Sequence, residues 1–314
     1  MMSVKVTPVT DPVWLGEGPH WSHEHQALFF VSIFDRSVHK YDPASGKCTS
    51  SKLDDMPGFI IPLEGKKDQF VVGLKRKVVV IQWDGEDGTA RLVRTVTELD
   101  EHAPDNRIND AKADPRGRLF VGTMGHEYEP GKFRLKQGAL YRVDADGAGG
   151  AGGARRVVRD VDISNGLCWD ERGRAFYYAD SFEYAIRRYD YDVDTGDISN
   201  PRLVFKYAEH GLEGIVDGMT IDTDGNLWVA NFDGSQVLKI DPRAGKLLQK
   251  VPIPALQTTS ATFGGPDLDV LYVTSASMNR GAEQKPPSGA TFRVTGLGAR
   301  GHPNVSVRLQ DDKC

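Results

Sequence analysis

Residues 217–246 read DGMTIDTDGNLWVANFDGSQVLKIDPRAGK, and this stretch predicts a sheet of short strands. An apolar entry leads into the acidic turn DTDG, and the aromatic and β-branched run NLWVAN follows it. A second turn then leads to an alternating run that closes on Asp-Pro-Arg-Ala-Gly. Short runs of this composition, bounded by Gly, Asp and Pro, are typical of β-strands joined by hairpins.

The same phrase recurs along the chain. No window has the i, i+3, i+4, i+7 apolar spacing of a capped helix, so almost no helix is expected. Spacings of about 40 to 50 residues with four strands per copy are the period of propeller blades. The sequence therefore predicts an all-β, six-bladed β-propeller with four antiparallel strands per blade and one domain over residues 1–314. The alternative is two β-sandwiches joined by a linker near the middle of the chain. Six copies, 41 to 56 residues apart, begin at Gly18, Phe59, Asn109, Asn165, Asp217 and Thr258.

The glycine-rich run 147–153 (GAGGAGG) is the low-complexity stretch at which such a linker would lie. It falls between two strand-like runs of one copy, GALYRV and RRVVRDV. We therefore interpret it as the tip of a hairpin within a blade. Glycine as a whole is enriched, at 34 of 314 residues. That enrichment is expected of a chain with many tight turns.

Composition narrows the class of protein. The 39 Lys and Arg against 44 Asp and Glu give a net charge of −5, which argues against nucleic acid or an anionic membrane as a main partner. The three cysteines, Cys48, Cys168 and Cys314, are far apart and form no CxxC motif, so a reducing compartment is expected. No run of 18 apolar residues and no signal-peptide pattern occurs. The expectation is a cytoplasmic protein, a monomer or weak dimer, that acts on a small molecule.

Four polar residues stand at similar places in four copies, just before the apolar run: Glu17, Asn109, Asn165 and Asp217. In a propeller these places converge on one axis. Two carboxylates and two amide oxygens are hard donors that suit Ca²⁺, Mg²⁺ or Mn²⁺. The competing interpretation is turn chemistry, because Asn-Gly and Asp-Gly are strong hairpin signals. Four aligned polar residues favour the metal site.

Six motifs carry a family resemblance, and in chain order they are GEGPHW (16–21), NRINDAKADPRGRLFVGTM (106–124), DISNGLCWD (162–170), VDGMTIDTDGNLWVA (216–230), TTSATFGGPDLDVLYVTSA (258–276) and VTGLGARG (294–301). The chain resembles the regucalcin (senescence marker protein)/gluconolactonase family, and FIIPLEG (59–65) is similar to its insect branch with luciferin-regenerating enzyme. The resemblance runs from about Glu17 to Gly301 and implies a six-bladed propeller with one divalent metal in its channel.

Carried over by motif, the resemblance implies Glu17, Asn165 and Asp217 as metal ligands, with Ca²⁺ favoured and Zn²⁺, Mn²⁺ or Mg²⁺ as alternatives. Asp217 is also implied as the general base. Asn109 is implied to lie beside the metal. Together with Arg107 and Glu127 it is implied to bind the substrate.

Three departures from the family pattern stand out. Ala111 replaces the usual glycine of Asn-Asp-Gly-Lys, so an unstrained φ is expected there. Ser32 stands where Val-Asp-Ile is common, which removes an acid near the channel. The segment 126–136 (HEYEPGKFRLK) corresponds to a variable lid loop, and Glu127 belongs to it.

The favoured function is metal-dependent hydrolysis of a sugar lactone such as gluconolactone. Two alternatives remain open: a calcium-binding regulatory protein, and an enzyme acting on a phosphotriester or an oxyluciferin-like heterocycle. A heterocycle pocket needs an apolar wall, for which five aromatic residues are candidates. No EF-hand loop occurs, and the acidic turns DADG, DTDG and DERG are interpreted as blade hairpins. The five aromatic candidates are Phe34, Phe59, Phe182, Tyr184 and Phe232.

Overall fold

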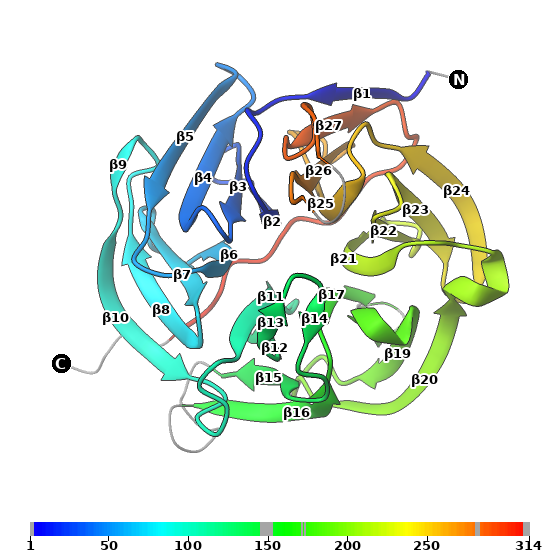
Figure 1. Cartoon of the computed structure of the whole chain (residues 1–314), viewed down its shortest axis with the longest axis horizontal. Helices are drawn as coiled ribbons and strands as arrows, with labels where there is room; N and C mark the ends of the chain where they lie inside the picture. The colour runs from blue at the N-terminus through cyan, green and yellow to red at the C-terminus, as the bar shows by residue number, and fades with distance from the viewer. Residues whose placement is uncertain (1–2, 145–152, 171, 173, 280–282, 310–314) are drawn as a thin grey trace.

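The computed structural model describes residues 3–144, 153–170, 172, 174–279 and 283–309. Within them, six antiparallel sheets stand as blades around one axis (Figure 1). The predicted all-β six-bladed propeller is confirmed, and the alternative of two sandwiches is wrong. Helix is confined, in this part of the chain, to the 3-10 turns η1 (Ser181–Glu183) and η2 (Tyr207–His210). No helix of the described residues is long and apolar enough to cross a membrane.

The first three blades follow the chain in order. Blade one contains β2 (Gly16–Ser22), β3 (Ala27–Ser32), β4 (Ser37–Asp42) and β5 (Lys47–Lys52), with the short β9 (Gly88–Thr89) added parallel to β5. Blade two contains β6 (Pro57–Pro62), β7 (Gln69–Leu74), β8 (Lys77–Gln82) and β10 (Arg91–Glu98). Blade three contains β11 (Arg107–Ala113), β12 (Leu119–Met124), β15 (Gly138–Val143) and β16 (Ala154–Val161).

The last three blades continue the pattern. Blade four contains β17 (Ser164–Asp170), β18 (Ala175–Asp180), β19 (Ala185–Tyr191) and β20 (Ile198–Lys206). Blade five contains β21 (Ile215–Ile221), β22 (Leu227–Phe232), β23 (Gln236–Asp241) and β24 (Lys246–Pro252). Blade six contains β25 (Gln257–Gly264), β26 (Val270–Ala276), β27 (Phe292–Thr295) and, from the other end of the chain, β1 (Lys5–Pro8).

Two details concern the turns. The acidic turn DTDG between β21 and β22 is a hairpin turn as predicted, because the Asp222 carboxylate accepts the N–H groups of Asp224 and Asn226. Residues 145–152 lie outside the described residues, so the hairpin interpretation of the glycine run stays a prediction. The strands on either side of that run, β15 and β16, pair antiparallel.

The ring is closed by the two ends of the described chain. Strand β1 pairs with β27 and becomes the outer strand of blade six, as the blue strand beside the orange blade in Figure 1 shows. Beyond β27 the chain crosses to other blades, where Gly301 bridges Asp222 of blade five and Val307 bridges Leu63 of blade two. Residues nearly 300 positions apart therefore share one sheet, which the repeat pattern alone did not predict.

The six innermost strands all break their regular pairing at one level. In β17 the pairing skips Asn165 and Gly166, and in β21 it skips Asp217 and Gly218. These Asn-Gly and Asp-Gly pairs are thus bulges inside strands, and their interpretation as hairpin turns is wrong. A bulge breaks the strand's alternation and re-aims a side chain. The skipped polar residues can therefore face the axis together.

Glycine follows each of these two polar residues because the inner strands approach closely. A Cβ on Gly166 would lie 2.7 Å from the backbone oxygen of Asp217 in the next blade. A Cβ on Gly218 would lie 2.5 Å from the Cβ of Ser260. No side chain fits at these contacts, so glycine here permits blade-to-blade packing around the site.

The apolar core lies in layers between neighbouring blades. One cluster joins Phe59, Val71 and Val80 of blade two to Ile108 and Val121 of blade three, all buried. Phe59, a candidate for the apolar wall of the site, belongs to this core instead. The core thus holds adjacent inner strands in register, which fixes how far the polar residues stand from one another.

The buried His20 is expected to make the stability of the fold depend on pH. It lies in β2 and is buried, and burial, with Lys112 and His25 nearby, lowers its pKa from 6.5 to about 3. Between pH 6.5 and about 3, the imidazole of His20 is protonated in the unfolded chain but stays neutral in the folded chain. Stability is therefore complete above pH 6.5 and falls as the pH drops toward 3, by about 2 kcal/mol at pH 5.

Urea unfolding at pH 7.5 and 5.0 measures this effect. His20→Gln should shrink the stability difference between the two pH values by about 2 kcal/mol. The exposed His102→Gln serves as the matched control and should leave the difference as it is in the parent protein. An unchanged difference in His20→Gln would refute the assignment.

Candidate functional site

A pocket of about 540 Å³, its open mouth included, lies at the end of the propeller axis where the inner strands bulge. All six site residues predicted from the sequence line it, so the fold brings together residues that are up to 200 positions apart. They are Glu17, Arg107, Asn109, Glu127, Asn165 and Asp217.

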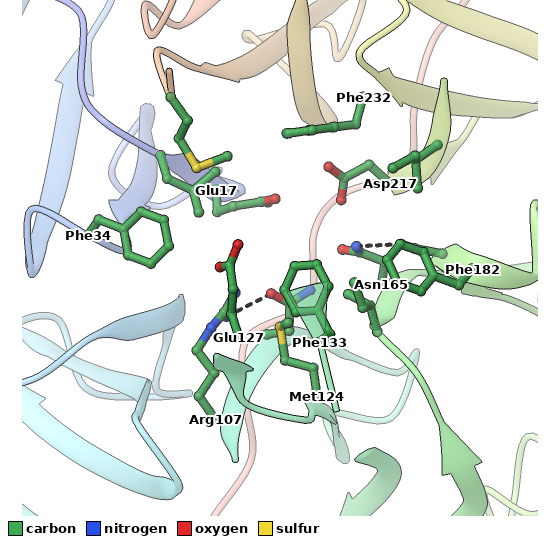
Figure 2. Close-up of a pocket in the computed structure, with 16 residues that line it drawn as sticks. Glu17, Phe34, Arg107, Met124, Glu127, Phe133, Asn165, Phe182, Asp217 and Phe232 are labelled. Atoms are coloured by element: carbon green, nitrogen blue, oxygen red, sulfur yellow. Dashed lines mark hydrogen bonds between the residues drawn. The ribbon is translucent and has the colours of Figure 1, made fainter. Parts of the chain in front are cut away.

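Three of these residues point at one central space. Figure 2 shows the carboxylates of Glu17 and Asp217 and the amide of Asn165 directed toward the same point from three blades. Asn165 and Asp217 occupy the same bulge position. Glu17 stands one residue ahead of it and pairs with Val31 just before the skipped Gly18. The prediction that all four polar residues occupy one repeat position is therefore wrong for Glu17, which reaches the centre from the preceding position.

The two asparagines differ in what their amide oxygens do. The Asn165 Nδ2 donates to the Ser181 Oγ at 2.8 Å, and its Oδ1 is buried with no hydrogen-bond partner in the structure. The Asn109 Nδ2 donates to the Ser164 backbone oxygen at 2.9 Å, and its Oδ1 accepts from Arg107 at 2.7 Å. A buried oxygen without a donor is costly unless a ligand satisfies it. Asn165 therefore has the geometry of a ligand and Asn109 that of a neighbour.

A cation would stabilise the charged form of the buried carboxyl groups in and beside the pocket. Burial, and then the charge of Asp110, raises the pKa of Glu17 to about 8. Burial also raises the pKa of Asp110 to about 6, against the opposing charge of Lys112. A nearby dication favours ionised carboxylates and reverses such shifts.

The donor set also fits a hard metal. Among the described residues no group of three or more His, Cys, Asp and Glu side chains could hold a metal ion. The oxygen donors that meet here belong to Glu17, Asn165 and Asp217, and two carboxylates with an amide oxygen suit Ca²⁺, Mg²⁺ or Mn²⁺ better than a thiolate-binding metal.

Arg107 and Glu127 lie on the side of the pocket facing Asp217 (Figure 2). Arg107 donates through Nη1 to Asn109 and to the backbone oxygen of Ile108, so part of its guanidinium holds the site together. Glu127 begins the separate hairpin of β13 (Glu127–Glu129) and β14 (Lys132–Phe133), and its Oε1 accepts the Gly131 N–H at 2.7 Å. The segment 126–136 thus contributes Glu127 and Phe133 directly to the pocket.

The geometry can now be compared with known proteins. Residues 15–277 match the sequence profile described as the SMP-30/Gluconolactonase/LRE-like region. The chain belongs to this family. The regucalcin of Gallus gallus is 39% identical over 310 residues, which covers 96% of this chain and 98% of that protein. The regucalcin of Homo sapiens is 36% identical, with 96% and 97% covered.

Solved structures of the SMP-30/gluconolactonase family match the whole fold. A luciferin-regenerating enzyme superposes with a TM-score of 0.91 at 39% identity, covering 98% of this chain and 100% of that one. A regucalcin from Agrobacterium tumefaciens, described as a calcium-binding protein, superposes with a TM-score of 0.83 at 26% identity, covering 96% and 97%.

Two departures from the family pattern have structural explanations. Ala111 pairs regularly with Val121 and does not adopt a positive φ, so the expected unstrained backbone is confirmed. Ser32 is buried, and its hydroxyl donates to Asp35 at 2.6 Å rather than facing the pocket. The same Asp35 accepts the Trp14 N–H at 2.8 Å. Ser32 therefore anchors the loop ahead of blade one.

Several lining residues were not predicted from the sequence. Phe34, Phe182 and Phe232 line the pocket as proposed, whereas Tyr184 only stacks against Phe182. The other apolar residues come from turns and strand ends, where no periodic signal marks them. Ser181 was also missed, because it is placed only by the turn after β18. The unpredicted lining residues are Leu15, Met124, Phe133, Ile163, Ser181, Ile215 and Met278.

Proposed function

We propose that this protein is a divalent-metal-dependent hydrolase that opens a lactone ring, with gluconolactone as the reference substrate. The observation that supports the proposal most is the buried, unpartnered Oδ1 of Asn165 beside the carboxylates of Glu17 and Asp217. Membership of the SMP-30/gluconolactonase family supports it as well. Glu17, Asn165 and Asp217 would hold the ion, with Ca²⁺ favoured.

Each side chain has a role in this scheme. When bound, the dication would supply Lewis-acid polarisation of the lactone carbonyl. Asp217 accepts the proton of the attacking water as general base and returns it to the ring oxygen when the acyl C–O bond breaks. Asn109, fixed between Arg107 and Ser164, presents a rigid edge to the ring, and Glu127 and Arg107 bind ring hydroxyls. Burial of the pocket floor strengthens all of these polar contacts.

The test is metal removal followed by reconstitution. The chelated protein should hydrolyse gluconolactone no faster than buffer, and one of Ca²⁺, Mg²⁺, Mn²⁺ or Zn²⁺ should restore turnover at one ion per chain. An aromatic lactone and a phosphotriester are assayed beside it. Metal binding without turnover of any of these substrates would refute the enzyme and favour a calcium-binding regulatory protein.

A second candidate is an enzyme acting on an aromatic heterocycle of the oxyluciferin type. The observation that favours it is the aromatic side of the pocket, where Phe133 packs edge-on against Phe182 at 5.7 Å. A solved luciferin-regenerating enzyme is also similar over the full length. Turnover of such a heterocycle with no turnover of any lactone would establish this candidate instead.

Ser181 is expected to increase the affinity for the metal ion, because it orients the side chain of Asn165. Its Oγ accepts from the Asn165 Nδ2 at 2.8 Å and donates to the Val216 backbone oxygen at 2.7 Å, so it aims the Asn165 oxygen at the centre. Loss of such a supporting contact costs about 10- to 100-fold in metal affinity. Ser181→Ala should weaken Ca²⁺ or Mn²⁺ binding by this factor in calorimetry. The exposed Ser199→Ala of the same blade is the control, and equal affinities in both variants would contradict the role.

A further inference from the structure

A second cavity opens directly outside the metal pocket. The two cavities share Phe34, Glu127 and Met278, so they are continuous. The outer one is bordered by Trp14, Met56 and Tyr128 as well. We call it the outer groove. Arg36, Glu127 and Glu129 also border it, and its apolar side is formed by Trp14, Phe34, Met56, Tyr128 and Met278.

Trp14 is held in place as a wall of the outer groove. Its backbone N–H donates to the Asp35 carboxylate at 2.8 Å, and its backbone oxygen accepts the Ser277 N–H at 3.0 Å. Its ring packs edge-on against Phe34, with centroids 5.6 Å apart. Trp14 is thus fixed to the loops of blades one and six. A preformed apolar wall binds a ligand without the entropic cost of ordering a loop.

The groove nevertheless leaves large aromatic surface uncovered. Trp14 and Tyr128 are each 53% exposed, and they come from separate segments that border the same cavity. Exposed apolar residues that gather around a hollow mark a binding surface, whereas scattered ones need no explanation. The shared lining with the metal pocket indicates that this surface serves the same ligand.

The inner pocket has a polar side and an apolar side, and the apolar side adjoins the outer groove. Asn109, Asn165 and Asp217 lie at the bulges of the inner strands, and Glu127 is the polar residue nearest the groove. Phe133 and Phe182 pack together on the apolar side of the pocket, and Phe34 and Met278 lead to the groove. Hydroxyl groups placed against this apolar side would lose their hydrogen bonds to water without replacement. An apolar substituent placed there loses nothing and gains burial.

We propose that the outer groove is a second subsite, which binds an alkyl or aryl substituent of the lactone whose ring lies in the metal pocket. The inference rests on the proposed lactone hydrolysis and adds that lactones with an apolar side group are better substrates than those with an unsubstituted ring. Each methylene that enters the groove should raise kcat/KM by about fourfold. The increase should stop when the groove is full.

The experiment uses the metal-loaded protein and γ-lactones whose alkyl chain grows from none to six carbons, with a phenyl-substituted lactone beside them. In Trp14→Ala and Tyr128→Ala the ratio of kcat/KM between the longest and the unsubstituted lactone should fall at least tenfold. Leu248→Ala, which removes an exposed side chain from an outer strand, is the matched control and should keep the parent ratio. A ratio near one in the parent protein would overturn the subsite.

A binding measurement separates this inference from the proposed function. The other four tryptophans, Trp21, Trp83, Trp169 and Trp228, are buried, so iodide should quench mainly Trp14. A 2-hexylcyclopentanone, which has no ester bond, should protect Trp14 from iodide. Protection without hydrolysis of any lactone would support the subsite and refute the proposed function. Hydrolysis without chain-length dependence or protection would refute the subsite and keep the function. Protection that depends on protein concentration alone would mean that a second copy covers the groove, which also overturns the proposal.

Discussion

Asp217→Asn is expected to lower kcat on a lactone by about 10² to 10⁴-fold through loss of the general base alone. Asp217 lies in the bulge of β21, buried at the centre of the pocket with Glu17 and Asn165. The amide keeps the shape of the side chain but cannot accept the proton of the attacking water. Weaker metal binding adds to the loss, because one of two carboxylates disappears.

Kinetics at saturating metal separate these two contributions. A deficit in kcat that persists at saturation belongs to the base, and a deficit that metal relieves belongs to binding. Asp224→Asn, in the exposed part of the DTDG turn of the same blade, is the matched control and should keep full activity. An Asp217→Asn variant with more than a tenth of the parent kcat would refute the mechanism.

Deletion of residues 1–8 is expected to destabilise the fold by roughly 3 to 6 kcal/mol, from lost strand hydrogen bonds and apolar burial. Strand β1 pairs with β27 over four residues, Lys5–Pro8, and Val6 packs on the core of blade six. Without it, β27 becomes an open edge and Val294 loses its partner Val6, while its pairing with Leu271 of β26 remains. This loss is a large part of the stability of an ordinary protein.

We propose from the same closure that the chain forms one cooperative domain. The parent protein should then unfold in urea in one transition that fluorescence and circular dichroism both follow. Thr7→Pro, which removes the N–H that faces Arg293 of β27, should reproduce much of the deletion's effect, and the exposed Lys5→Ala should not. Two separate transitions in the parent would contradict the single domain.

The fold could be predicted because its signals are local. Alternation of apolar residues and the turn chemistry of Asp, Gly and Pro are properties of neighbouring residues, and their repetition set the number of blades. The closing strand escaped prediction for the opposite reason. Four residues at Lys5–Pro8 have no repeat context, and their partner, β27, lies almost a full chain length away.

The sequence predicted which polar residues form the candidate site, but it did not predict how their side chains are arranged. Asn109 and Asn165 look alike in sequence, each just before an apolar run. Only the contacts distinguish them, because Arg107 occupies the oxygen of Asn109 and nothing in the structure occupies that of Asn165. Such contacts join different blades or depend on side-chain orientation, which no local pattern encodes.

By itself, the sequence determined the blade repeat, the family and the polar residues that gather on the axis. The tertiary structure alone decided that Asn-Gly and Asp-Gly form bulges inside inner strands rather than turns. It also decided that Trp14, Phe34 and Tyr128 border one groove beside the axial pocket. The physical reason is the distance along the chain over which each interaction acts. Turn and strand preferences act within a few residues. Bulges and pockets instead arise where segments from different blades pack against one another.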